Sequence, residues 1–131
     1  MTPAALTTQY IKQGACNACV DRFDAGAGVA GYVEVYDGAV LAVTFTLANP
    51  AFGAATLADP SVANCNGLPI SAVAVADVAA ADNYIAYDTA GVAIGTGTVS
   101  VTGGAGEVQL DNVIIAAGLT RTLVTFTVTQ P

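Results

Sequence analysis

The sequence predicts an all-β fold, a β-sandwich or jelly roll of about seven to eight strands with one short N-terminal helix. Three observations lead to this prediction. Apolar and polar residues alternate with period two in several stretches, which is the pattern of half-buried strands. Turn-forming pairs such as Asp-Gly and Gly-Gly separate these stretches at short intervals. Helical spacing of apolar residues is confined to a segment near the N-terminus.

The chain of 131 residues is expected to form a single domain, 1–131. Residues 1–7 are expected to be an extended arm, because Pro3 disfavours an early helix and no periodic pattern begins before Thr8. Residues 8–24 predict the helix, and the glycines that follow end it. Four residues at offsets 0, 3, 4 and 7 share one helical face, namely Cys16, Cys19, Val20 and Phe23.

Residues 31–131 are expected to form the β-sandwich. In GYVEVYDG (31–38), Val33 and Val35 share one face and an Asp-Gly turn follows. In VLAVTFTL (40–47), the predicted inward residues are Val43, Phe45 and Leu47, opposite Thr44 and Thr46. In the final stretch, RTLVTFTVTQP, they are Val124, Phe126 and Val128, opposite Thr125, Thr127 and Thr129.

Further short strands are predicted between these, at residues 70–76, 83–88, 92–101, 107–110 and 113–115. The connection 48–69 contains Asn-Pro, Asp-Pro and Asn-Gly pairs and no periodic pattern, so it is expected to be a long loop.

Composition excludes several classes of function. Ten acidic and three basic residues give a net charge of −7, and the bases Lys12, Arg22 and Arg121 are scattered. Three bases cannot neutralise a phosphate backbone, so nucleic acid is not an expected partner, and neither is an anionic membrane surface. No apolar run is long enough for a membrane span, and Met1 is not followed by a signal sequence, so we expect synthesis in a cytoplasm. Charged residues make up only 10 %, against about 25 % in typical domains, which suits packing against another protein.

The spacing C-x-x-C in ACNACVD raises the question of a metal or redox site. A structural zinc site needs four ligands, usually Cys and His, and this chain has three cysteines and no histidine. Cys65, with Asp21 or Asp24, would have to complete the set. A thioredoxin-like pair lies at a helix start in a βαβ unit, whereas this pair lies in mid-helix. We therefore predict that Cys16 and Cys19 pack in the core as small apolar residues.

Acidic and aromatic residues offer weaker candidates. Glu34 with Asp37, or Asp82 with Asp88, are the carboxylate pairs that an acid–base mechanism would use, but strand-surface and turn positions explain all four. No calcium-loop pattern of alternating acids accompanies them. An aromatic platform for a sugar would come from four tyrosines, of which Tyr32 and Tyr36 share a face: Tyr32, Tyr36, Tyr84 and Tyr87. Packing on neighbours or at an interface explains tyrosines in strands equally well.

Catalysis is not expected. Without histidine there is no ordinary Ser-His-Asp or Cys-His system, and Lys12 is the only lysine. The glycines of GTGTVSVTGGAG (95–106) lack the Gly-Lys-Ser/Thr and the helix of a phosphate-binding loop, so they are interpreted as strand and hairpin glycines. We predict that the protein is not an enzyme and has no catalytic, cofactor-binding or metal-binding residues.

Three stretches carry a resemblance to a known family: AGVAGYVEVYDG, LAVTFTLANPAFGAA and the closing LVTFTVTQP. With them the chain resembles small structural proteins of tailed bacteriophages and prophages, over nearly its whole length. The PAFGA segment, residues 50–54, is the most specific part of the resemblance. The CNAC helix and Cys65 depart from the family pattern.

The resemblance implies a jelly-roll capsid decoration (cement) protein, which binds the outer surface of the major capsid protein shell and stabilises it. The implied partners are the major capsid protein and further copies of the chain, and the implied location is the capsid surface of the virion. The arm 1–7 and the loop 48–69 are the expected docking elements. A tail- or fibre-associated virion protein is the first alternative, and a carbohydrate- or calcium-binding β-sandwich module is the second.

Overall fold

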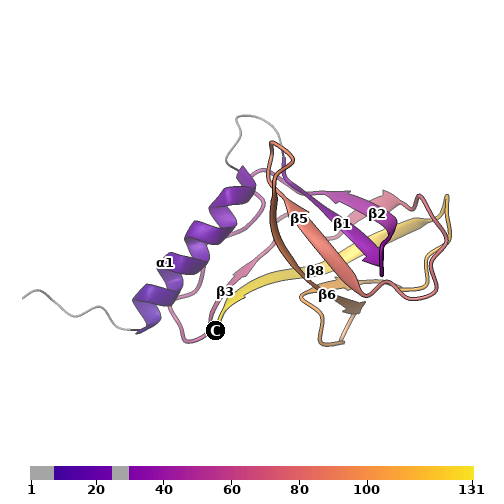
Figure 1. Cartoon of the computed structure of the whole chain (residues 1–131). Helices are drawn as coiled ribbons and strands as arrows, with labels where there is room; N and C mark the ends of the chain where they lie inside the picture. Colours follow the sequence, from indigo (N-terminus) through magenta and orange to yellow (C-terminus); the bar gives the residue numbers. More distant parts are fainter. Residues whose placement is uncertain (1–7, 25–29) are drawn as a thin grey trace, which may run out of the picture.

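Eight strands curl around one apolar core, with a helix at one end, in the computed structural model, which describes residues 8–24 and 30–131 (Figure 1). The fold is all-β and sandwich-like with one short helix, as predicted. The elements are α1 (Thr8–Asp21), the 3-10 turn η1 (Arg22–Asp24), β1 (Tyr32–Asp37), β2 (Val40–Thr46), β3 (Ser61–Asn64), β4 (Ile70–Val73), β5 (Asn83–Tyr87), β6 (Ala93–Val101), β7 (Val108–Leu110) and β8 (Thr120–Gln130).

The strands follow the order β2-β1-β5-β6-β7-β8-β3, and β4 also pairs with β8. β3 and β4 lie one after the other along the same strand, because β3 pairs with residues 127–130 of β8 and β4 with residues 120–123. The sheet approaches closure where the Val75 amide donates to the Ala42 carbonyl of β2 at 2.8 Å. Ala42 is free for this bond because a register shift in β2 leaves it outside the β1 ladder.

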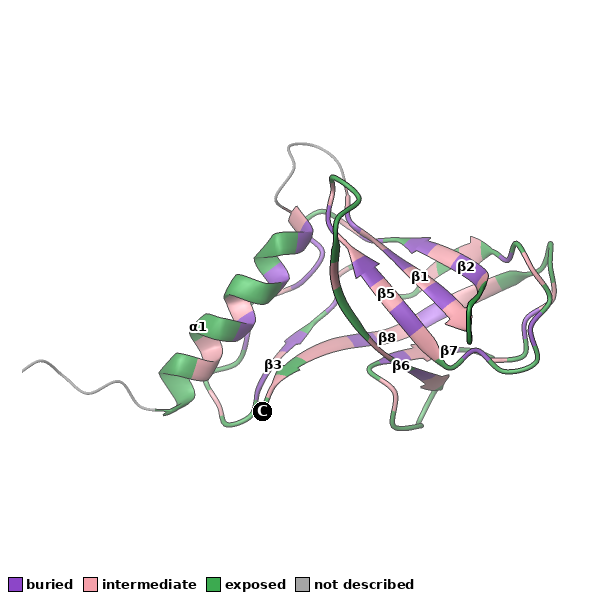
Figure 2. Ribbon diagram, viewed as in Figure 1, coloured by how far each residue is buried: buried purple, intermediate pink, exposed green. Residues whose placement is uncertain are grey.

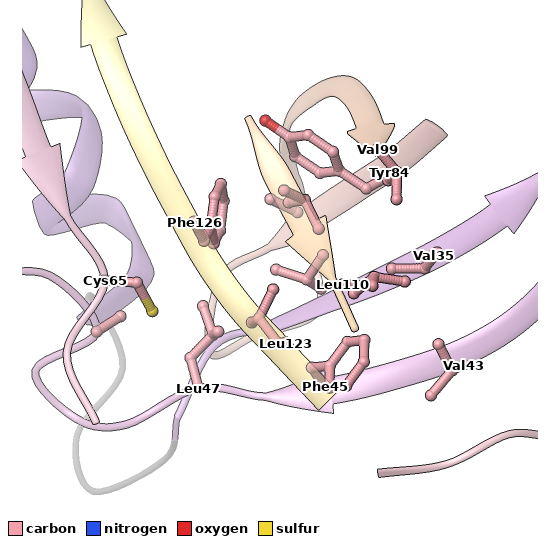
Figure 3. Packing of buried hydrophobic residues seen from close by; sticks show 14 of the residues in the cluster. Val35, Val43, Phe45, Leu47, Cys65, Tyr84, Val99, Leu110, Leu123 and Phe126 are labelled. Atoms are coloured by element: carbon pink, nitrogen blue, oxygen red, sulfur yellow. The ribbon is translucent and has the colours of Figure 1, made fainter. Parts of the chain in front are cut away.

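The strand alternation predicted for β1 and β2 is confirmed. Val33, Val35, Val43 and Phe45 are fully buried, and Leu47 is nearly so (Figures 2 and 3). Period two places every second side chain on the inner face, where apolar burial stabilises the sheet. All described strand pairs are antiparallel except β6 with β7, which is parallel.

The predicted helix is confirmed, although one member of its apolar face is exposed. Cys16, Val20 and Phe23 are buried and Cys19 is not. The helix packs on β3 and β8. Phe23 continues into an aromatic cluster, with ring centroids 5.0 Å from Phe52 and 6.1 Å from Phe126, which joins the helix to the sheet.

The prediction of a structureless loop over residues 48–69 was wrong. Its second half contains β3, whose Ser61 and Ala63 are fully buried. The strand forms because β8 supplies a partner that is distant in the sequence. It was not predicted because its four residues are too few to give a periodic signal.

Two predictions near the C-terminus were also wrong. Residues 113–115 are not a strand, and Ile115 makes only an isolated bridge to Val78. In β8, the inward residues are Leu123 and Phe126, whereas Val124 is only half-buried. Leu110 pairs with Leu123 and Gln109 with Thr125, so Val124 is an extra residue in the ladder and the alternation restarts after it. The strands predicted at 70–76 and 107–110 are shorter than expected, as β4 ends at Val73 and β7 begins at Val108.

The N-terminal arm predicted for residues 1–7 lies outside the described residues, as do residues 25–29.

Candidate functional site

The three cysteines take different positions. Cys16 is fully buried, and its thiol donates to the Val128 carbonyl at 3.6 Å. Cys65 is buried beside β8, and burial raises its pKa to about 11. Cys19 is exposed, and partial burial of its thiol followed by the nearby Cys16 raises its pKa. The prediction of core packing is therefore confirmed for Cys16 and wrong for Cys19, which is exposed.

Asp21 and Asp24, the acids that would complete a metal site, are not available beside the cysteines. Asp24 accepts the Ala51 amide at 3.0 Å and so fixes the start of the PAFGA segment to the helix end, while Asp21 is exposed. Across residues 8–24 and 30–131, no three His, Cys, Asp or Glu side chains gather closely enough to hold a metal ion. A zinc site therefore finds no support in the described part of the chain.

The first carboxylate pair is divided between two roles. Glu34 lies on the outer face of β1 and accepts the Tyr36 hydroxyl at 2.6 Å, which is the largest cause of a raised Tyr36 pKa. Asp37 accepts the Ala80 amide at 3.2 Å and so ties the β1–β2 turn to the segment before β5.

The second carboxylate pair consists of turn residues, as the sequence suggested. Asp88 is buried and accepts two backbone amides of the β5–β6 turn at 2.9 Å, those of Ala90 and Val92. Asp82 accepts the Asn83 side-chain amide and the Gly38 backbone amide, which in that order lower its pKa. These local bonds leave no carboxylate in either pair arranged as a general acid beside a base.

Three of the four tyrosines lie together on the outer face of the sheet. Tyr32 and Tyr87 are directly paired across β1 and β5, and their rings stack with centroids 4.8 Å apart. Tyr36 lies four residues after Tyr32 along β1, on the same face, and donates its hydroxyl to Glu34. The rings of Tyr32 and Tyr87 cover each other, so each offers one face rather than a joint flat platform.

Tyr84 points the other way, into the core side of β5. Burial and then its hydrogen bond to Glu107 raise its pKa, so the hydroxyl stays protonated and donates to the carboxylate at 2.7 Å. Gly97 makes this bond possible, since a Cβ there would lie 1.8 Å from the Glu107 carboxylate oxygen. Tyr84 and Glu107 together form part of the wall of a pocket, and neither is arranged to activate a nucleophile.

That pocket lies between β6 and β8 and has a volume of about 220 Å³. Sites for small molecules occupy about 300–1,000 Å³, so this one is small for a metabolite. Residues of α1, β5, β6 and β8, and the residue before β7, line the pocket: Cys19, Tyr84, Gly95, Thr96, Glu107, Thr127, Val128 and Thr129. Sequence reasoning missed this site, because its residues come together only through the pairing of β6, β7 and β8.

A second feature missed from the sequence is an exposed apolar end of the sheet. Val73, Val75, Ile114 and Leu119 are each 54–64 % exposed. The Ala74 amide donates to the Leu119 carbonyl and the Val78 amide donates to the Ile115 carbonyl, so the chain segments that carry these four residues adjoin. We call these four residues the apolar end. Arg121, beside them, donates to the Ile114 carbonyl at 2.8 Å.

The PAFGA segment is held against the helix rather than projecting from the fold. Ala51 and Phe52 are buried, and Ala55 accepts the Gln13 amide and donates to Asn17. Further along, Lys12 and Asp59 form an ion pair. The first part of the expected docking loop is therefore held along α1, although many residues of the loop, such as Leu57, remain exposed.

No helix in the described part of the chain is long and apolar enough to cross a membrane. Comparisons of the chain with protein-family models, with curated proteins and with solved structures found no match.

Proposed function

We propose that the protein is a capsid decoration protein that binds the outer surface of a phage capsid shell, in contact with the major capsid protein and with copies of itself. The observation that carries the proposal is the apolar end: four large aliphatic side chains exposed on adjoining segments of a protein with few charges. Contiguous exposed apolar groups mark surfaces for protein partners. The family resemblance supplies the identity of the partner.

The chemistry of the described residues is consistent with a structural role. Each candidate acid accepts hydrogen bonds that hold a strand or a turn in place, and burial keeps the Tyr84 hydroxyl protonated. A decoration protein needs a rigid body and a surface that excludes water, and it needs no reactive group. Many copies on one lattice also turn modest contacts into strong retention.

The test is binding to expanded, undecorated phage capsids, measured by co-sedimentation. Changing Val75 and Ile114 together to threonine keeps β-branched residues but replaces one apolar group at each site by a hydroxyl. We expect binding at least tenfold weaker, about 1.4 kcal/mol. The matched control is Val92→Thr, because Val92 is 54 % exposed but lies in the β5–β6 turn, away from the apolar end. Equal binding by the double variant and the control would contradict a docking role for the apolar end.

Deletion of residues 1–7 tests the expected arm separately. We expect lower occupancy on capsids and an unchanged circular dichroism spectrum, since the core of residues 8–24 and 30–131 is built from Cys16 onward. Unchanged occupancy would count against the arm.

A tail- or fibre-associated role is the alternative within the same class, and detached tails in a parallel sample distinguish it. A sugar-binding role would rest on the faces of Tyr32 and Tyr87 that their stack leaves uncovered. Glycan-array binding lost in Tyr87→Ala would favour that reading over the capsid.

A further inference from the structure

The sheet has an open slot where β7 stops short. β7 has three residues, whereas its neighbours β6 and β8 have nine and eleven. β7 pairs with residues 99–101 of β6 and residues 123–126 of β8. Residues 93–98 of β6 and 128–130 of β8 extend past β7 and Glu107 on the side where the 220 Å³ pocket lies.

The backbone of β6 presents hydrogen-bonding groups to this slot. The Val99 amide donates to Asp82 next to β5, so in the antiparallel ladder Val99, Gly97 and Gly95 face β5. The residues between them face the other way, and Thr96 therefore directs its N–H and C=O toward the pocket that it lines.

The backbone of β8 does the same from the opposite side. The Thr127 amide donates to the Glu107 carbonyl, so residues at spacing two from Thr127 face the β7 side of the strand. Thr129 thus directs its N–H and C=O into the slot. Among the described residues no strand pairs with this part of either edge. Unpaired strand edges are templates for an added strand.

We propose that the slot between β6 and β8 binds the N-terminal segment of a second copy, residues 1–7, as an added strand. This inference rests on the proposed function, where it names the contact between copies. The segment MTPAALT has no charged side chain, and Ala4 and Ala5 are small enough for a narrow slot that has Gly95 in its wall. Its proline lies near one end, where a paired strand tolerates it.

Chain length favours binding of the segment in the slot of a second copy over binding in the slot of its own chain. Cys19, in the slot wall, lies eleven residues along α1 from Thr8, which is about 16 Å at 1.5 Å per residue. Seven extended residues span about 23 Å. A segment turning back along its own helix would use about five residues to reach Cys19 and leave about two for pairing. A neighbouring copy can enter the slot from its open side with its whole segment.

Cys19 supplies the test, because it is the exposed thiol of the three and lies in the slot wall. In the full chain, an Ala5→Cys variant is oxidised with glutathione disulfide, and the products are separated on a non-reducing gel. We expect a covalent dimer joined between position 5 and Cys19, shown by peptide mass spectrometry. The expected rate is at least tenfold that of Val101→Cys, which places a thiol at an exposed position beyond the slot. Adding Cys19→Ser to Ala5→Cys should abolish the dimer.

Two results would overturn the inference. A disulfide within one chain would show that the segment returns to its own slot. Crosslinking no faster than with Val101→Cys would show that the slot does not hold the segment. The measurement uses no capsids, so either failure leaves the capsid proposal standing, and a loss of capsid binding leaves the slot result unchanged.

Discussion

Phe126 is the residue whose removal should cost the fold most. Its side chain is 1 % exposed and lies where the helix, the PAFGA segment and the sheet meet. Its ring centroid is 5.1 Å from Phe52 and 5.4 Å from Tyr84, both in edge-on geometry, and 6.1 Å from Phe23. Truncation therefore removes contacts to three separate elements at once.

The magnitude follows from the burial. Phe→Ala changes in cores cost about 3–5 kcal/mol through lost transfer energy and the cavity left behind. Aromatic pairs add about 0.5–1.5 kcal/mol beyond burial. For Phe126→Ala we expect a loss of about 4 kcal/mol of unfolding free energy, a large share of the about 5–15 kcal/mol typical of a domain.

Urea titration followed by far-ultraviolet circular dichroism measures the change. With a slope of about 2 kcal/mol per molar urea, the midpoint should fall by about 2 M at constant slope. Phe126→Leu refills most of the space and should lose less than half as much. Leu119→Ala is the exposed control, at 54 % exposure, and should change the free energy by no more than about 0.5 kcal/mol. A loss in Phe126→Ala below about 1 kcal/mol would refute the reasoning that this ring joins the three elements.

Three further sets of substitutions test single features of the fold by the same titration. Gly97→Ala should lower the free energy of unfolding by about 1–3 kcal/mol, because its Cβ would lie 1.8 Å from the Glu107 carboxylate. Gly14→Ala is the control, since it has open space at its Cβ in mid-helix, and it should raise the free energy of unfolding by about 0.5–1 kcal/mol. Equal effects of the two substitutions would contradict the clash. Asp88→Ala should cost about 1–3 kcal/mol by leaving two turn amides without an acceptor, and Asp88→Asn should recover most of it; no difference between them would contradict the turn role. Burial raises the Cys65 pKa to about 11, so the folded state keeps the thiol proton after the unfolded state has lost it, and stability should fall as pH rises from about 9 to 11. Cys65→Ala should remove that part of the decline, and an unchanged slope would show that burial does not hold the proton.

The parts of the fold that local pattern determines could be predicted from the sequence. Helix α1 and strands β1, β2, β5 and β6 carry their own periodicity, and their bounds lie within a few residues of those expected. The prediction of strand-surface and turn positions for the acids is confirmed, because Asp88 accepts amides two and four residues later and Asp82 accepts the Asn83 side chain.

The remaining features depend on contacts distant in the sequence. β3 exists because β8 pairs with it, and the break in the β8 alternation at Val124 follows from a register shift against β7. Cys19 shares helical spacing with buried residues, yet it lies in the wall of a pocket that distant strands form and that local spacing cannot reveal. The slot and the apolar end arise in the same way, from a three-residue strand and from the pairing of β4 with β8.

The central claim is that this fold decorates a phage capsid, and one measurement tests it most directly. The purified protein is sedimented with expanded, undecorated capsids and, in parallel, with detached tails. We predict saturable co-sedimentation with capsids in a fixed ratio to the major shell subunit, and none with tails. Co-sedimentation with tails alone would indicate a tail protein and contradict the capsid assignment. Binding to neither would contradict a structural role in the virion.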